Sequence, residues 1–252
     1  MARDSNFNKE YFDKWIDFVQ TRNIDHDQKQ VATLTNDEGK AMCGNDLFKN
    51  SVQLSIMCYS RGDAIPNIRK SVSQMVRMLE LKHSIMASVQ LEKDVRQMYE
   101  RLDLGTLYES LTLLAFMVSL HFPAQDILHV LALIDHAGED TLLDKIAHIF
   151  GETTRKVGQQ SKFPKIYNTL VEIIAAPPLQ QGALLKKYVE GWYKRMKPIY
   201  WYGNHEGGEG AYFGYWCFEA ALIAMLFKID DSELANHPNY PADLVHYYRN
   251  PI

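Results

Sequence analysis

The stretch GTLYESLTLLAFMVSLHFP, residues 105–123, decides the fold class. Thr106 and Glu109 have the spacing of a capping box, so a helix is predicted to begin there. The run Leu107–Leu120 is largely apolar, although Glu109 and Thr112 interrupt it, and it is shorter than the roughly 20 residues that a helix needs to span a bilayer. Pro123 then suits the first turn of a following helix. The stretch therefore predicts a helix buried in a protein core.

Helical periodicity extends in both directions from this stretch. Upstream, apolar residues at steps of three and four predict one long amphipathic helix over residues 66–99. Downstream, Pro and Gly residues separate further apolar stripes, which predict helices over 123–138, 142–151, 164–177 and 184–198. Short turns between such helices are typical of antiparallel hairpins. The predicted fold class is all-α, with antiparallel helical hairpins packed as an N-terminal and a C-terminal helical sub-domain.

The domain division and the irregular segments follow from the same pattern. A soft boundary separates expected sub-domains of residues 1–121 and 122–252. The polar stretch Asn23–Asn45 is predicted to be a loop. A weak strand-like pattern occurs at Val31–Thr35 and Ile199–Tyr202, and neither segment could sustain a sheet.

The composition is typical of a folded protein kept in a reducing compartment. Of 252 residues, 46% are hydrophobic and 23% are charged, and a chain of this length should bury roughly 70–75% of its unfolded surface. Cys43, Cys58 and Cys217 are an odd number without a CxxC pair, which favours reduced thiols over a disulfide framework. The polar segment Met1–Lys9 lacks the apolar core of a secretory signal. We therefore expect a cytoplasmic protein.

The charge and the missing motifs narrow the class of function. A net charge of −4 argues against a broad nucleic-acid surface, because phosphate binding needs clustered Lys and Arg. A basic protein partner would be attracted by the same excess of acids. The sequence contains no G-x-S-x-G elbow, P-loop or dinucleotide-binding motif, so neither catalytic residues nor a cofactor is predicted. The sequence thus indicates a non-enzyme that contacts neither a membrane nor nucleic acid directly.

Histidines next to acids are the strongest hint of catalytic or metal chemistry. Asp25-His26-Asp27 and Asp135-His136 combine residue types used in metal ligation and acid–base catalysis. Neighbours in sequence point about 100° apart on a helix, however, and no second motif completes a ligand set. His129 and His136 are seven residues apart and could share a helix face. Ordinary polar contacts are favoured and no metal site is predicted, with a metal-dependent helical hydrolase left open as an alternative.

The segment Gly203–Gly210, GNHEGGEG, is the stretch richest in glycine. Its charged residues are acids, whereas a phosphate-binding loop would need Lys or Arg. The segment is therefore predicted to be a mobile acidic loop. It either contacts a partner or simply connects two helices.

A high density of aromatic residues surrounds this loop, with ten of them between positions 192 and 218. Such a density suits either an interface or a core. Tyr212, Tyr215, Trp216 and Glu219 fall at steps of three and four. This spacing predicts that Trp216 packs in the core and that Glu219 turns inward, where it needs a hydrogen-bond partner.

Three motifs in the last forty residues carry a family resemblance. They are GYWCFEAA at residues 214–221, IDDS at residues 229–232 and HPNYPADLV at residues 237–245. Together they resemble the C-terminal domain of the PoNi immunity family. The segments KEYF at residues 9–12 and YSRG at residues 59–62 resemble that family's N-terminal domain.

The resemblance implies an antidote that binds and neutralises a PoNe-type nuclease (DNase) toxin, delivered by type VI or related secretion systems during interbacterial competition. Inhibition could cover the toxin's active site or block a required rearrangement, and the oligomeric state stays open. Direct occlusion would place acids and aromatic anchors against a basic toxin. The residues expected to contact the toxin are then Glu206, Glu209, Asp230, Asp231, Tyr202 and Tyr212. A helical scaffold for another partner and the metal-dependent hydrolase are the alternatives.

Overall fold

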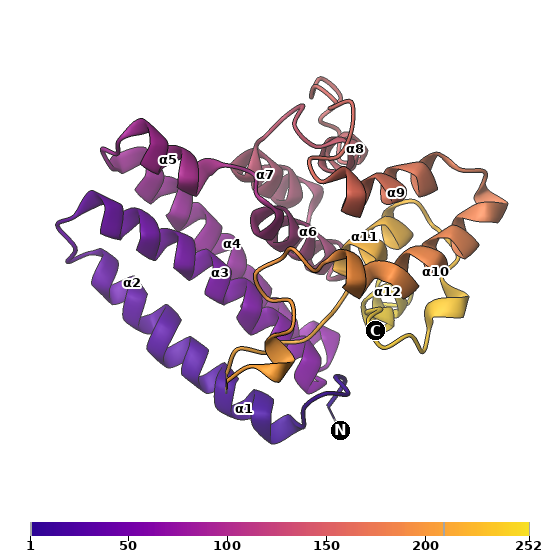
Figure 1. The fold of residues 1–252 in the computed structure, drawn as a ribbon, viewed down its shortest axis with the longest axis horizontal. Coiled ribbons are helices and arrows are strands. Elements are labelled where there is room, and N and C mark those ends of the chain that lie inside the picture. Colours follow the sequence, from indigo (N-terminus) through magenta and orange to yellow (C-terminus); the bar gives the residue numbers. More distant parts are fainter. Residues whose placement is uncertain (1, 209, 252) are drawn as a thin grey trace. The chain divides into compact units, whose positions relative to one another are not determined.

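Helices are the regular elements of the structure, a computed structural model that describes residues 2–208 and 210–251 (Figure 1). No strand occurs among these residues. The all-α prediction is therefore confirmed. The strand-like segment Val31–Thr35 is the end of a helix followed by a turn, and Ile199–Tyr202 lies in a run of turns and bends.

The apolar stretch of residues 105–123 folds mainly as a helix enclosed by other helices. Helix α6, Leu104–Ser119, begins two residues before Thr106, and residues 107–119 are all buried. The longer segment Lys93–Ser119 is apolar and long enough to cross a membrane, but 83% of its apolar window lies inside the protein. This burial confirms a core helix.

The chain divides into two units. Unit 1 comprises Met1–Asp103 and Asn204–Gly214, and unit 2 comprises Leu104–Gly203 and Tyr215–Ile252. These units differ from the sub-domains expected on either side of residue 121 in where they place α6 and the segment Asn204–Gly214. The expected sub-domain boundary stays a prediction.

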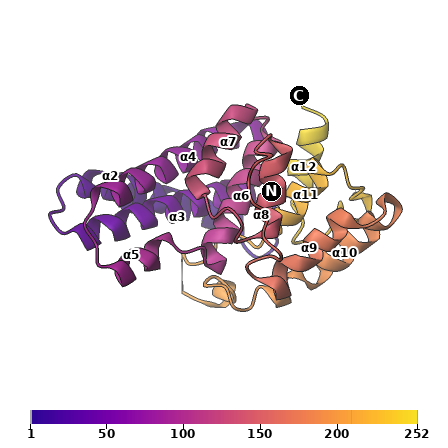
Figure 2. The ribbon, with the colours of Figure 1, turned by 90° about the horizontal axis from the view of Figure 1, so that it is seen from above.

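Unit 1 is a set of helices around one long pair. Its elements are α1 (Lys9–Phe18), the π-helical η1 (Val19–Ile24), α2 (Asp25–Val31), α3 (Asp37–Arg61), α4 (Ile65–Ser88), α5 (Lys93–Glu100) and the 3-10 turn η2 (Asn204–Glu206). Asn8 and Asn36 cap α1 and α3 by accepting hydrogen bonds from backbone N–H groups of the first turns. Gly62, with a φ of 97°, ends α3. The chain then returns as α4, which lies beside α3 in both views (Figure 1, Figure 2).

The single long helix predicted over residues 66–99 was wrong, because the structure breaks it at residues 89–92 into α4 and α5. Val89 is extended at the break. The guanidinium of Arg96 donates hydrogen bonds to the carbonyl oxygens of Met86 and Val89, at 3.0 and 2.7 Å. Carbonyls at a helix end need such partners. Arg96 therefore stabilises a break that apolar periodicity does not reveal.

The polar stretch Asn23–Asn45 is mostly helical, so the predicted loop was also wrong. Helices α1, η1 and α2 follow one another without interruption, and residues 32–36 alone are irregular before α3 begins. In this rod the side-chain amide of Gln20 donates to the carboxylate of Asp25 at 2.6 Å. The loop was predicted because this segment lacks an apolar pattern. Hydrogen bonds between polar side chains along the helix stabilise it instead.

Unit 2 consists of helical hairpins, as the downstream pattern predicted. Besides α6, its elements are α7 (Ala124–Ile134), α8 (Thr141–Ile149), α9 (Pro164–Ala175), α10 (Pro178–Arg195), α11 (Phe218–Leu226), the 3-10 turn η3 (Ser232–Leu234) and α12 (Ala242–Arg249). Prolines lie in the first turns of α9 and α10, where a missing N–H costs little. Helices α9 and α10 lie side by side (Figure 2), and α6 packs against α11 and α12. This packing makes α6 part of unit 2.

Candidate partner-binding surface

An aromatic strip runs along helix α1 in unit 1. Tyr11, Trp15 and Phe18 lie on one face of the helix because they are four and three residues apart. Phe7 stacks on Tyr11 with ring centroids 4.2 Å apart, and Trp15 meets Phe18 edge-on at 5.3 Å. Tyr212 joins the strip at 4.9 Å from Phe7. The ring of Phe18 stays 45% exposed at the open end of the strip.

The N-terminal segment and α1 hold Tyr212 in a clasp formed by Asp4, Asn6 and Tyr11. The Tyr212 hydroxyl donates to the carboxylate of Asp4 at 2.5 Å and accepts from the side-chain amide of Asn6 at 2.7 Å. The Tyr11 hydroxyl donates to the Tyr212 carbonyl at 2.9 Å and accepts from the Tyr212 N–H at 3.2 Å. Burial raises the pKa of Asp4, although its hydrogen bonds act in the opposite direction. This Tyr212 clasp anchors Asn204–Gly214 in unit 1.

Replacing Tyr212 with phenylalanine should lower the free energy of unfolding by about 1–3 kcal/mol, because the buried Asp4 carboxylate loses a hydrogen-bond donor. Urea unfolding followed by circular dichroism measures the change. Tyr202→Phe is the matched control, since no hydrogen bond of the Tyr202 hydroxyl is seen among the described residues. The control should shift stability by less than about 0.5 kcal/mol. Equal effects of the two substitutions would contradict the anchoring role.

The acidic loop folds back on itself and packs on the aromatic strip. The side-chain amide of Asn204 donates to the carbonyl of Ala211 and so closes the loop. Gly210 has a φ of 89°, and a Cβ atom there would lie 2.5 Å from the ring of Trp15. Glycine therefore permits both the left-handed backbone and the close approach to the indole.

Three of the expected toxin contacts fall in this loop segment. The side chain of Glu206 is 81% exposed and lies 3.7 Å from the ring of His205. Tyr212 is buried, with 1% exposure, and acts as an anchor in this structure. Glu209 lies outside the described residues. The contact role of all three stays a prediction, and Glu206 projects into solvent as that role requires.

Asp230 and Asp231, the next two expected contacts, belong to unit 2 and differ in exposure. Asp231 is buried, accepts from the Tyr240 hydroxyl at 2.7 Å and pairs with Arg249 at 2.5 Å. Asp230 is exposed, and its carboxylate accepts from the backbone N–H of Ser232 at 3.0 Å. That hydrogen bond lowers the pKa of Asp230. Asp231 thus ties α12 to the preceding turn, while Asp230 offers its charge to solvent.

Tyr202, the sixth expected contact, packs in an aromatic group of unit 2. Its ring stacks on that of Tyr193 at 4.6 Å, and Tyr193 contacts Tyr215 at 4.8 Å. Within the described residues, no hydrogen bond or ring contact joins Tyr202 to Asp230 or Asp231. Tyr202 therefore belongs to an aromatic group with Tyr193 and Tyr215, and neither aspartate bonds to it.

The aromatic interior of unit 2 encloses a carboxylate. Glu219 in α11 accepts from the indole N–H of Trp192 at 2.6 Å and from the hydroxyl of Tyr188 at 3.3 Å. Burial raises its pKa to about 7. The expectations that Glu219 finds a hydrogen-bond partner inside and that Trp216 is buried are both confirmed. The helical spacing behind them was wrong, because α11 begins at Phe218 and residues 211–217 are irregular.

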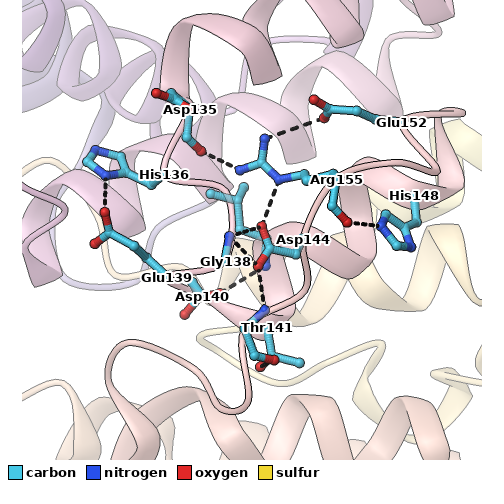
Figure 3. A network of polar contacts seen from close by, with 12 residues as sticks. Asp135, His136, Gly138, Glu139, Asp140, Thr141, Asp144, His148, Glu152 and Arg155 are labelled. Carbon is cyan, nitrogen blue, oxygen red and sulfur yellow. Dashed lines mark hydrogen bonds and ion pairs between the residues drawn. The ribbon is translucent and has the colours of Figure 1, made fainter.

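A second buried network joins the loops on either side of α8 in unit 2 (Figure 3). Asp144 and Arg155 are both buried, and the guanidinium donates to the carboxylate at 2.7 Å. The same carboxylate accepts from the backbone N–H groups of Gly138, at 3.1 Å, and Gly158, at 2.9 Å. Arg155 also donates to the carbonyl of Asp135. One ion pair thus fixes two loops.

Asp140 and a surface group extend this network (Figure 3). Asp140 caps α8 by accepting from the Leu143 N–H at 2.9 Å, and its other oxygen accepts from the Lys162 N–H at 2.7 Å. Glu139 lies at the surface and pairs with Lys162 at 2.8 Å and with His136 at 3.0 Å. Burial raises the pKa of Asp140, whereas the hydrogen bond from Lys162 lowers that of Glu139. These contacts position backbone segments.

Sequence patterns did not predict that Asp140 and Asp144 are buried. A signal existed for Asp140, which stands three residues before Leu143 at the start of an apolar stripe, the spacing of a helix cap. No local signal pairs Asp144 with Arg155, because a separation of 11 positions in sequence leaves many partners open.

Histidines and cysteines form no metal-binding group of three or more among residues 2–208 and 210–251. His26 bonds to a neighbouring aspartate at 3.2 Å, His148 bonds to a backbone carbonyl at 2.8 Å, and His129 is exposed. Burial raises the pKa of Cys43 to about 11 and that of Cys58 to about 12. These free thiols therefore stay protonated near neutral pH and are poor nucleophiles.

A solved structure shares the fold of this chain. Protein PA2201 from Pseudomonas aeruginosa is similar to it with a TM-score of 0.71, over 98% of this chain and 90% of that chain, at 17% sequence identity. At that identity the likeness shows a shared fold. No curated protein matches the sequence.

The helices of the two units make this an all-α protein. It encloses buried carboxylates and carries an exposed acidic loop. Residues 138–244, which contain both the Asp144 network and Glu219, match the family model described as PoNe immunity proteins (PoNi), C-terminal. This match confirms the resemblance seen in the three C-terminal motifs, whereas the resemblance of residues 9–12 and 59–62 to the family's N-terminal domain stays a prediction. Over this region the chain is similar to the PoNi immunity proteins.

Proposed function

We propose that the protein binds and neutralises a cognate secreted nuclease (DNase) toxin in the cytoplasm of the bacterium that produces it. The match of residues 138–244 to the PoNe immunity proteins carries the proposal. The toxin would arrive from competing cells through a type VI or related secretion system. Protection then comes from a stoichiometric complex, without turnover of a substrate.

The exposed acids support a nuclease as the partner. An enzyme that cleaves DNA must present Lys and Arg to the phosphates of its substrate. Carboxylates on an inhibitor can occupy the same basic surface and speed the encounter. Glu206 and Asp230 are exposed carboxylates, one in each unit. Both are therefore available to such a partner.

Inhibition in purified components tests the proposal. The product of the adjacent gene, taken as the candidate nuclease toxin, is incubated with linear DNA, either alone or after mixing with increasing amounts of this protein. We expect cleavage to stop at a fixed molar ratio and the two proteins to co-elute in size-exclusion chromatography. Unchanged cleavage would overturn the proposal, and co-elution without inhibition would instead support the scaffold alternative.

The metal-dependent hydrolase alternative predicts a different titration. A catalyst would inactivate the nuclease at far less than one molar equivalent, and elemental analysis of the purified protein would find bound metal. A sharp end point near one equivalent supports binding. The two mechanisms are thus separated by stoichiometry in the same assay.

A further inference from the structure

We infer that one face of helix α1 in unit 1 receives the basic DNA-binding groove of the toxin. The α1 face consists of Glu10, Asp13, Asp17 and Phe18. The loop that packs on this helix at Trp15 carries a further exposed acid, Glu206. The inference rests on the proposed function, because it takes the partner to be a DNA-cleaving enzyme.

Three acids form a row along the α1 face. Glu10, Asp13 and Asp17 are three and four residues apart, so their side chains project from one side of the helix, and all three are exposed. Asp13 pairs with Arg61 at 2.8 Å, whereas Glu10 and Asp17 have no ion-pair partner within the described part of the chain. Like charges at this spacing weaken a helix. Glu10 lies in the first turn, where a negative charge favours the helix, but the pair Asp13 and Asp17 is not explained by the stability of α1.

Phe18 gives the α1 face an apolar anchor. Its ring is 45% exposed, and Trp15 supports it edge-on at 5.3 Å. Lys14, which follows Asp13 in sequence, lies over the Trp15 ring at 4.8 Å. The π-helical η1 begins directly after Phe18, and π-helical turns are frequent at functional sites. An aromatic ring bordered by charges resembles the anchor residues of protein interfaces.

The Tyr212 clasp holds the acidic loop on this helix. Tyr212 is bonded to Tyr11, and Gly210 packs on Trp15 one turn farther along. The loop that carries Glu206 is thus fixed at two points of α1, while the Glu206 side chain remains 81% exposed. A loop that is already ordered loses less conformational entropy when a partner binds. The fold therefore presents Glu206 in a prepared position.

The charges of the α1 face identify the occupant. A DNA-binding groove places Lys and Arg along a strand that carries one phosphate for about every 3.4 Å of the duplex axis. Glu10 and Asp17 are separated by a rise of about 10 Å along the helix, which is the length of roughly three phosphates. The row of acids can thus replace a short stretch of DNA backbone. Phe18 adds an apolar contact beside it.

Charge reversal on α1 tests this assignment. The probe is the nuclease encoded by the adjacent gene, carrying a substitution that abolishes cleavage, and its affinity for the full-length protein is measured by isothermal titration calorimetry. The double variant Glu10→Lys/Asp17→Lys should bind at least about tenfold more weakly. Phe18→Ser should also lose at least about tenfold in affinity.

The matched control is Glu172→Lys/Glu190→Lys, which reverses two exposed acids on α9 and α10 of unit 2. Its affinity should stay within about twofold of the wild type, as expected for charges outside the contact. Thermal unfolding checks that each variant is folded. If the charge-reversed protein is not folded, the affinity of Phe18→Ser alone decides whether the α1 face binds the nuclease.

Two results would overturn the assignment of the α1 face as the docking surface, and they can be told apart. Unchanged affinity of the folded α1 variants, with a wild-type protein that binds and inhibits, would refute the docking face and leave the proposed function standing. A wild-type protein that neither binds nor inhibits the nuclease would refute the proposed function and the docking face together.

Discussion

Replacing Asp144 with alanine is expected to lower the free energy of unfolding by about 3–5 kcal/mol. The substitution leaves the buried guanidinium of Arg155 without the carboxylate that lies 2.7 Å away. It also removes the acceptor for the backbone N–H groups of Gly138 and Gly158. Buried charges and buried donors are both costly without partners. Because folded proteins are stable by only about 5–15 kcal/mol, the loss should be large on the scale of the whole chain.

Urea unfolding measures this effect against a control in the same network. The surface pair of Glu139 and Lys162 is about 40% exposed, so Glu139→Gln should cost at most about 1 kcal/mol. The double variant Asp144→Leu/Arg155→Met, which removes both charges, should recover part of the loss. A cost of Asp144→Ala as small as that of Glu139→Gln would show that the ion pair does not hold the two loops.

Glu219 should make the protein less stable as the pH rises towards 7. Burial raises the pKa of this carboxyl from its ordinary value of 4.5 to about 7. Between these two values the folded state keeps the proton while the unfolded state releases it, so stability falls as the pH increases. The contribution is complete below pH 4.5 and is lost through pH 7, with a total of about 3 kcal/mol.

The variant Glu219→Gln isolates this effect, because glutamine is neutral at every pH and its oxygen can still accept from the Trp192 N–H. Its stability relative to the wild type should increase by about 3 kcal/mol between about pH 4.5 and about pH 7.5. Glu219→Ala, in contrast, should be destabilised at both pH values, since Trp192 and Tyr188 lose their acceptor. A constant difference between Glu219→Gln and the wild type across this range would contradict the raised pKa.

Local patterns predicted the helices whose cause is local. The apolar run that forms α6 favours burial away from water, so its place in the core followed from its composition. Prolines and glycines marked the hairpins of unit 2, because they restrict or permit backbone angles regardless of the rest of the chain. Trp216 and Glu219 are buried as predicted, although the helical spacing used to place them was wrong, because α11 begins only at Phe218.

Contacts between distant residues account for what was missed. The break after α4 depends on Arg96 reaching back to Met86 and Val89, and the anchoring of the acidic loop depends on Tyr212 meeting Asp4. Asp4 and Tyr212 are 208 residues apart, a separation at which periodicity carries no information. The buried position of Tyr212 has this origin.

The acids of α1 illustrate a signal that sequence reasoning can use. Glu10, Asp13 and Asp17 have helical spacing within a segment whose helix is capped by Asn8. The glycine-rich segment drew attention to Glu206 instead, because loops often carry function. The structure brings both features into unit 1 through the Tyr212 clasp. A row of like charges on a helix therefore merits the same scrutiny as an acidic loop.

Survival of a sensitive bacterium is the direct test of whether this protein neutralises the nuclease in cells. The nuclease encoded by the adjacent gene is expressed in such cells together with this protein, with the unstable variant Asp144→Ala, or alone. The account predicts that the wild-type protein restores growth and leaves chromosomal DNA intact, whereas cells with the nuclease alone die. Growth arrest and DNA degradation despite abundant, folded wild-type protein would contradict the account.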